Sequence, residues 1–277
     1  MQQLSVDSPT TAADPALTRF AAGWTISLVA FFFTTYALAA WISGLRHNVP
    51  SLVFGWEVHI PFLAWTIVPY WSTDLLFVCS PFLFNSRDEL DTHCKRLLAV
   101  QAISVLIFLL FPLQFTFGRP HTTGLLGWIF LLRTGFDTQF NQAPSLHVGF
   151  AVVLWQAYSR HMTGNARWLT RGWIVLMSLA TLTTFRHHFI DLPTGLWVGL
   201  FCAAILPDGG SPAVGTRSPG SSKWFGIGAL YAVGAILFSA AAYRVGSVAW
   251  LIIWPVLALF FAAYRRWKSA NLRFDGR

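Results

Sequence analysis

Residues 20–45 read FAAGWTISLVAFFFTTYALAAWISGL and contain no charged side chain. About 20 apolar residues are enough for a helix to cross the hydrocarbon core of a bilayer. The preceding residues, 1–19, are polar and lack the basic start of a secretory signal peptide. This stretch therefore predicts an uncleaved membrane helix behind a polar N-terminal tail, and it sets the expectation for the fold class.

The composition extends that expectation to the whole chain of 277 residues. Only 11% of the residues are charged and 55% are hydrophobic, whereas a soluble domain carries roughly 25% charged residues. So few charges do not cover the surface of an ordinary cytosolic enzyme, which excludes that class. The high hydrophobic content excludes a disordered chain. The three Cys are odd in number and widely spaced, which indicates neither a disulfide framework nor a zinc site. We predict an all-α, polytopic integral membrane protein.

Five further apolar stretches before residue 207 are predicted to cross the membrane. They occupy about residues 60–84, 97–117, 145–160, 168–185 and 189–206. With the first stretch they predict a six-span catalytic membrane domain over residues 20–206. A Gly/Pro/Ser linker at 207–222 separates this domain from two more spans within 223–264. A basic tail, 265–277, follows.

The positive charges orient these eight spans. If the termini and alternate loops lie inside, 14 of the 19 Lys and Arg lie there, and the outside holds Arg46, Arg119, Arg133, Arg186 and Arg244. Cytoplasmic loops collect Lys and Arg, so both termini are predicted to be cytoplasmic, in a bacterial inner membrane or an equivalent one. The net charge of +8 then reflects topology, and no nucleic-acid partner is expected.

Three polar stretches fall on the predicted outer face. They are Arg119-Pro120, NQAPSLH at residues 141–147 and RHHFID at residues 186–191. A helix that begins at Ser145 would direct its first backbone N–H groups, those of Leu146 and His147, outward, where its dipole favours an anion. Arg119 adds a permanent charge with a donor fork suited to phosphate oxygens.

Two histidines and an aspartate add reactive groups to this face. His187 and Asp191 are spaced i, i+4, which predicts that they share one face of a helix start. A carboxylate there would fix His187 in one tautomer as a nucleophile, and His147 would protonate the departing oxygen. His188 is left aside, because on a helix it would face about 100° away. Each residue alone fits an ordinary interfacial role, but together they indicate phosphoryl transfer through a phospho-histidine.

The same stretches resemble the three-part signature of the type-2 phosphatidic acid phosphatases. The matches are Arg119-Pro120, then Pro144-Ser145-Leu146-His147 for Pro-Ser-x-His, then His187 and Asp191 for His-x-x-x-Asp. The resemblance covers residues 97–206. It implies a six-helix core, His187 as nucleophile oriented by Asp191, His147 as general acid, Arg119 and Ser145 at the phosphate, and no metal or cofactor.

Two phosphate-binding cations of that signature are missing from their usual places. The family's Lys is Pro112 here, and its Ser-Arg pair corresponds to Ala180 and Thr181. Arg133 and Arg186 lie on the predicted outer face and are expected to substitute for them. The Pro-Ser-Leu-His form is similar to the branch that contains inositol-phosphoceramide synthases, and the chain also looks like the membrane half of bacterial fusions with a dual-specificity phosphatase.

The sequence therefore predicts a membrane phosphatase that hydrolyses a lipid phosphomonoester or diphosphate, with a phosphorylated lipid and the bilayer as partners. A head-group phosphotransferase would use the same residues, with an alcohol in place of water as the acceptor, and the sequence does not decide between them. A non-catalytic lipid binder or transporter is the third alternative. Asp74 inside the second span faintly favours transport, although two matching halves with broken helices are not evident.

Overall fold

The computed structural model describes residues 14–134 and 139–206, together with residues 226, 233 and 234. Within these residues the fold is all-helical and contains no strand, which confirms the predicted all-α class. The linker predicted at 207–222, nearly all of the two later spans and the tail at 265–277 lie outside the described residues.

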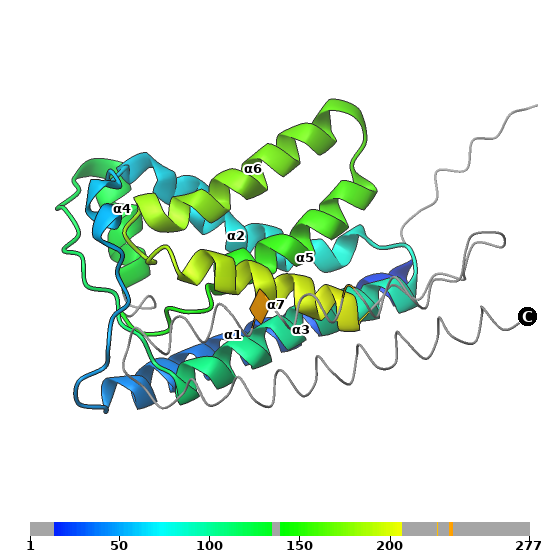
Figure 1. The fold of residues 1–277 in the computed structure, drawn as a ribbon. Coiled ribbons are helices and arrows are strands. Elements are labelled where there is room, and N and C mark those ends of the chain that lie inside the picture. The colour runs from blue at the N-terminus through cyan, green and yellow to red at the C-terminus, as the bar shows by residue number, and fades with distance from the viewer. Residues whose placement is uncertain (1–13, 135–138, 207–225, 227–232, 235–277) are drawn as a thin grey trace, which may run out of the picture.

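Each of the six apolar stretches predicted before residue 207 contains a helix, and one further helix lies between them. The α-helices are α1 Pro15–Gly44, α2 Ile67–Cys79, α3 Arg87–Leu110, α4 Gly124–Thr134, α5 Leu146–His161, α6 Gly164–Thr183 and α7 Asp191–Ile205. Short 3-10 segments are η1 Gly55–His59, η2 Ala64–Thr66 and η3 Ser80–Leu83. In Figure 1, α1 and α3 run side by side along one edge, α2 and α6 form the opposite edge, and α5 and α7 lie between.

Successive long helices run in alternating directions, so loops that are distant in sequence meet at one end of the bundle. The ends of α1, α3 and α6 lie at the same end of the bundle as the starts of α2, α5 and α7 (Figure 1). Backbone hydrogen bonds join these loops, since Leu63 N–H donates to Thr183 O at 2.8 Å and Ser145 N–H donates to Asp191 O at 2.9 Å. This end is called the site end below.

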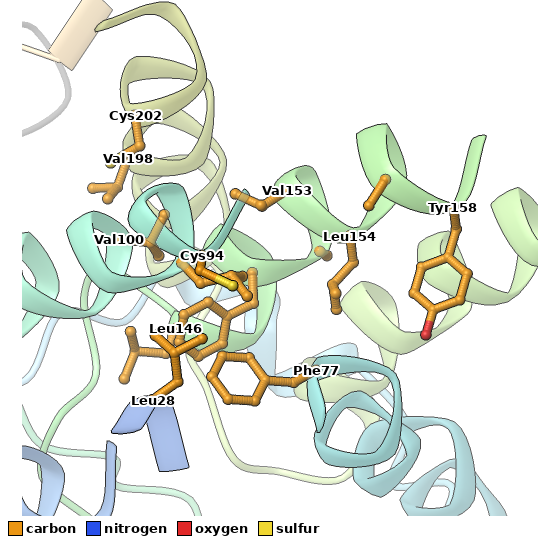
Figure 2. Close-up of a cluster of buried hydrophobic side chains, with 14 of the residues drawn as sticks. Leu28, Phe77, Cys94, Val100, Leu146, Val153, Leu154, Tyr158, Val198 and Cys202 are labelled. Carbon is orange, nitrogen blue, oxygen red and sulfur yellow. The ribbon is translucent and has the colours of Figure 1, made fainter. Parts of the chain in front are cut away.

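Apolar side chains from six helices form the core, including Ile174 and Met177 of α6. Figure 2 shows this cluster, which combines Leu28 of α1, Phe77 of α2, Cys94 and Val100 of α3, Leu146, Val153, Leu154 and Tyr158 of α5, and Val198 and Cys202 of α7. α5 contributes the largest share, because α2, α3, α6 and α7 all pack around it. Its first turn is thereby fixed from several sides.

α5 and α7 approach each other so closely that glycine is required between them. A Cβ on Gly195 would overlap the backbone oxygen of Ser145, and a Cβ on Gly199 would lie 2.7 Å from the backbone oxygen of Gly149. Real Cβ atoms do not tolerate such distances. The start of α7 is therefore held directly against the start of α5.

The outer surface of the helices is also apolar. Large exposed side chains include Ile26 at 70%, Leu75 at 64% and Leu169 at 75% relative exposure. By length and hydropathy, α1 and α3 are able to cross a membrane, and only 17% of the most apolar part of α1 is buried within the protein. α7 is apolar but shorter.

Capping and proline move the helix ends away from the hydropathy boundaries. α1 begins at Pro15 rather than at residue 20, because the Asp14 side chain accepts from Ala16 N–H at 2.9 Å; residues 15–19, predicted as part of the polar tail, therefore belong to α1. α3 begins at Arg87 rather than at 97 and ends at Leu110. Its first turns are charged and so lie outside the predicted apolar stretch, and Pro112, which has no N–H, follows its end.

Two other predicted segments have a different local structure. The stretch 60–84 is not one continuous span: α2 covers only Ile67–Cys79, with η2 before it and η3 after it. Residues 118–143, which lie between two predicted spans, contain α4. The charged residues of this segment, Arg119, Arg133 and Asp137, lower its average hydropathy, so the apolar residues of α4 did not stand out in the sequence.

Candidate functional site

The two residues of the predicted His–Asp pair touch, but not in the way the spacing suggested. α7 begins at Asp191, so His187 lies in the preceding loop and not on a shared helix face. This loop folds back because the N–H groups of Arg186 and His187 both donate to Thr181 O at 3.1 Å. His187 Nδ1 then lies 2.9 Å from Asp191 Oδ2.

Asp191 fixes the state of the His187 ring. Its side chain is buried at the N-terminus of α7, and its Oδ2 faces both His187 Nδ1 and the backbone N–H of His188. A carboxylate accepts hydrogen bonds only, so His187 Nδ1 carries a proton, and in the neutral ring Nε2 then keeps its lone pair. Among the described residues, no hydrogen-bond partner lies at His187 Nε2. The side chain is 8% exposed, and this is the arrangement that a nucleophilic imidazole requires.

His147 lies beside this pair, at the start of the neighbouring helix. It is the second residue of α5, and its ring centroid is 6.1 Å from that of His187, with the rings inclined at 65°. On its other side the ring of Tyr70 from α2 stacks at 4.1 Å. The structure therefore brings both predicted catalytic histidines together and supports one of them with a buried tyrosine.

Ser145 acts as the N-cap of α5. Its Oγ accepts from Val148 N–H at 3.5 Å, and its own N–H donates to Asp191 O at 2.9 Å. The first N–H groups of an α-helix point out of its end, and in α5 they begin at Leu146. The predicted anion site at this helix start therefore lies directly beside the His187–Asp191 pair, and Ser145 contributes to it mainly by forming the helix end.

Two predicted arginines converge on one aromatic ring of α4. The guanidinium carbon of Arg119 lies 5.7 Å from the centroid of Phe130, and that of Arg186 lies 5.9 Å from the same centroid. Arg119 Nη2 also donates to Phe185 O at 3.3 Å, which joins it to the His187 loop. Arg133 is part of α4, but its side chain lies outside the described residues. Thr181, where the resemblance would place Arg, is fully buried.

A second buried carboxylate–imidazole pair was missed by the sequence interpretation. Glu57 Oε2 lies 3.0 Å from His188 Nδ1, and these residues are 1% and 2% exposed. His188 had been set aside on the assumption of a helix, whereas it belongs to a loop and points into the protein. The only sequence signal for Glu57 was a charge in an otherwise apolar, aromatic segment.

The site thus combines an oriented imidazole, a second imidazole, a helix N-terminus and two guanidinium groups. Within residues 14–134 and 139–206, no group of three or more His, Cys, Asp or Glu side chains is placed to hold a metal ion. Comparison of the chain with protein families, with curated proteins and with solved structures finds no match. The resemblance to the type-2 phosphatidic acid phosphatases therefore stays a prediction that rests on the motif residues.

Proposed function

We propose that this chain is a multi-pass membrane phosphatase that hydrolyses a phosphate ester of a lipid through a phospho-histidine at His187. The observation that carries the proposal is the 2.9 Å contact between His187 Nδ1 and Asp191 Oδ2, with His147 directly beside it. The general acid thus comes from the start of α5, and the nucleophile and its orienting carboxylate come from the loop before α7 and the first residue of α7.

The proposed reaction has two steps. His187 Nε2 attacks phosphorus, the bond from phosphorus to the ester oxygen breaks, and His147 gives its proton to the departing alkoxide. Asp191 stabilises the positive charge that the His187 ring gains. Water then attacks the phospho-histidine, His147 takes a proton from it, and inorganic phosphate leaves, which restores both histidines.

Phosphoryl oxygens would be bound by groups that converge at the site end. Arg119 and Arg186 supply two fixed positive charges close to one ring, and the N-terminus of α5 supplies backbone donors. Electrostatic stabilisation and positioning provide most of the catalysis in phosphoryl transfer. In this proposal Arg186 replaces a cation that the type-2 phosphatidic acid phosphatase signature places at position 181.

The apolar exterior supports a lipid substrate and a location in the membrane. α1 is long, apolar and largely exposed within the isolated chain. A bilayer would cover this apolar surface, whose exposure to water is unfavourable. The distribution of Lys and Arg supports a multi-pass topology with cytoplasmic termini and the site end on the outer or periplasmic face. A lipid phosphate in the outer leaflet would then meet the site directly.

The test uses the purified full chain in vesicles with a panel of lipid phosphomonoesters and diphosphates. The expected result is release of inorganic phosphate that falls by about 10³-fold or more in His187→Ala, the size of effect seen when a nucleophile is removed. The matched control is His47→Ala, because His47 is exposed in the loop after α1.

Each alternative has its own outcome in the same assay. Transfer of a head group to an added alcohol without free phosphate would assign a phosphotransferase that uses the same residues. Binding of the lipids without either product would assign a lipid binder or transporter. Full turnover by His187→Ala would disprove the phospho-histidine at this position.

A further inference from the structure

Glu57 and His188 form the most enclosed ionisable pair at the site end outside the proposed catalytic set. We propose that they are positioning residues, which hold the loop that carries His187 and the segment that carries Arg119 in a fixed relation. This inference rests on the proposed function, because it assigns these two residues a role in that site.

Both oxygens of Glu57 are engaged. Oε2 accepts from His188 Nδ1 at 3.0 Å and from Phe189 N–H at 3.0 Å, and Oε1 accepts from Phe54 N–H at 2.8 Å. A buried carboxylate is costly unless such donors satisfy it. The carboxylate therefore joins the segment around η1 to the loop before α7, which is 131 residues away from Glu57 along the chain at His188.

The hydrogen bonds also fix the tautomer of His188. Thr116 N–H donates to His188 Nε2 at 3.3 Å, and the Thr116 hydroxyl lies 3.3 Å from the same nitrogen. A backbone N–H only donates, so Nε2 must present its lone pair and Nδ1 must carry the proton that Glu57 accepts. His188 is thus a neutral ring with a hydrogen bond on each side.

These contacts reach the catalytic set at two points. The backbone N–H of His188 donates at 3.1 Å to Asp191 Oδ2, the oxygen that also holds His187. Thr116 lies three residues before Arg119, whose Nη2 donates to Phe185 O in the same loop. The pair therefore connects the proposed nucleophile to the proposed phosphate-binding arginine without contacting the substrate position itself.

Aromatic rings enclose the pair. The His188 ring stacks on Phe115 at 4.5 Å and meets the edge of Phe117 at 4.9 Å, while Phe189 packs against Trp56 at 4.9 Å. Because this packing excludes water, the hydrogen bonds inside are strong and their loss is expensive. The same enclosure excludes His188 as the nucleophile, since its Nε2 is engaged and only 2% of the residue is exposed.

The kinetic test compares two variants of His188. His188→Phe keeps a ring between Phe115 and Phe117 but removes the hydrogen bonds of both ring nitrogens, whereas His188→Asn keeps an N–H that can donate to Glu57. We expect His188→Phe to lower kcat and raise KM for the lipid phosphate, with a combined loss on the order of 10² in kcat/KM, as for a small misplacement of reacting groups. His188→Asn should recover part of it.

Glu89→Gln is the matched control, because Glu89 is the other glutamate of the chain and lies near the start of α3 at the opposite end. It should leave both constants unchanged. If His188→Phe lowers only the fraction of active molecules, its apparent kcat falls and its KM is unchanged. That result, with no recovery in His188→Asn, would assign the pair a purely structural role and overturn the proposal.

A second measurement does not depend on activity. Diethyl pyrocarbonate modifies accessible neutral histidines, and mass spectrometry of the full chain in detergent separates the sites. In the unaltered protein His187 should react and His188 should stay protected. Glu57→Gln should raise the rate at His188 on the order of tenfold, the value of one hydrogen bond to a charged group.

His93 reports whether each variant is folded, since it is 3% exposed and bonded to Ser80 at the opposite end. If Glu57→Gln exposes His93 as well, that variant is not correctly folded. The modification rate at His187 is then compared between the unaltered protein and His188→Asn. If His187 and His188 react equally in the unaltered protein, His188 is not enclosed, and the proposed positioning role of Glu57 and His188 is overturned. If no lipid phosphate is turned over but this footprint is as expected, the proposed function fails while the geometry of the pair stands.

Discussion

Asp191 is the residue on which the proposed chemistry depends most directly. Its Oδ2 accepts both from the His187 ring at 2.9 Å and from the His188 backbone at 3.1 Å, so one oxygen sets the tautomer and the loop. Asp191→Asn keeps the size of the side chain but presents an amide that does not specify the tautomer. We expect kcat for phosphate release to fall roughly 10²- to 10⁴-fold, as when the aspartate of a catalytic triad is replaced by asparagine.

The comparison for Asp191→Asn is Asp88→Asn, because Asp88 also lies in the first turn of a helix, α3, but at the opposite end. Initial rates at saturating lipid phosphate separate the two variants. Equal rates for both would remove the orienting role of Asp191.

The arginines at Phe130 lead to a second prediction at the residue scale. Arg119→Ala and Arg186→Ala should each raise KM for the lipid phosphate about 10- to 100-fold, the value of hydrogen bonds to a charged group. Arg133→Ala tests the remaining sequence prediction in the same assay. Arg46→Ala is the control, since Arg46 lies in the loop after α1 and donates to Leu109 O rather than facing Phe130. Unchanged KM in both Arg119→Ala and Arg186→Ala would rule out the pair as a phosphate site.

At the scale of the element, the contact between α5 and α7 decides whether the site assembles. Gly195→Ala would place a methyl group on the backbone oxygen of Ser145, so the two helix starts must separate. We expect a loss of about 1–3 kcal/mol in stability from overpacking, together with lower turnover. Gly172→Ala on α6 has open space around the new Cβ and should be neutral or slightly stabilising. Thermal unfolding in detergent compares them, and equal midpoints would contradict the close packing.

Much of this element structure was predictable, and the exceptions have physical reasons. Hydropathy locates apolar stretches, but helix ends depend on caps and proline, so α1 and α3 begin earlier than their apolar cores. α4 was missed because charged residues flank it. The motif residues were found because their chemistry is local in sequence. The partner of His188 was not, since Glu57 is 131 residues away and no local pattern indicates that contact.

At the scale of the whole molecule, the alternating helices explain why a few arginines depart from the inward bias predicted for the others. Arg46 donates to the end of α3, Arg119 donates to the loop before α7, and Arg186 is 6% exposed beside Phe130. Each is fixed by the fold at the site end. Their position is therefore set by packing and by the site, and they do not weaken the orientation that the remaining Lys and Arg indicate.

That orientation can be measured with one cysteine on each side of α5. His121 is exposed at the site end, and Asn165 is exposed in the first turn of α6 at the opposite end. The background carries Cys79→Ala and keeps the buried Cys94 and Cys202, which do not reach an aqueous reagent.

We expect a membrane-impermeant maleimide to label His121→Cys in intact cells and Asn165→Cys only after permeabilisation. α5 has 16 residues, which at 1.5 Å per residue gives about 24 Å, less than the roughly 30 Å hydrocarbon core. Its ends would therefore lie where other helices, and not lipid, surround the backbone. The reversed labelling pattern would place the site in the cytoplasm. Labelling of both positions from outside would mean that α5 does not cross the membrane. The site would then lie at the membrane surface and not within a membrane-spanning domain.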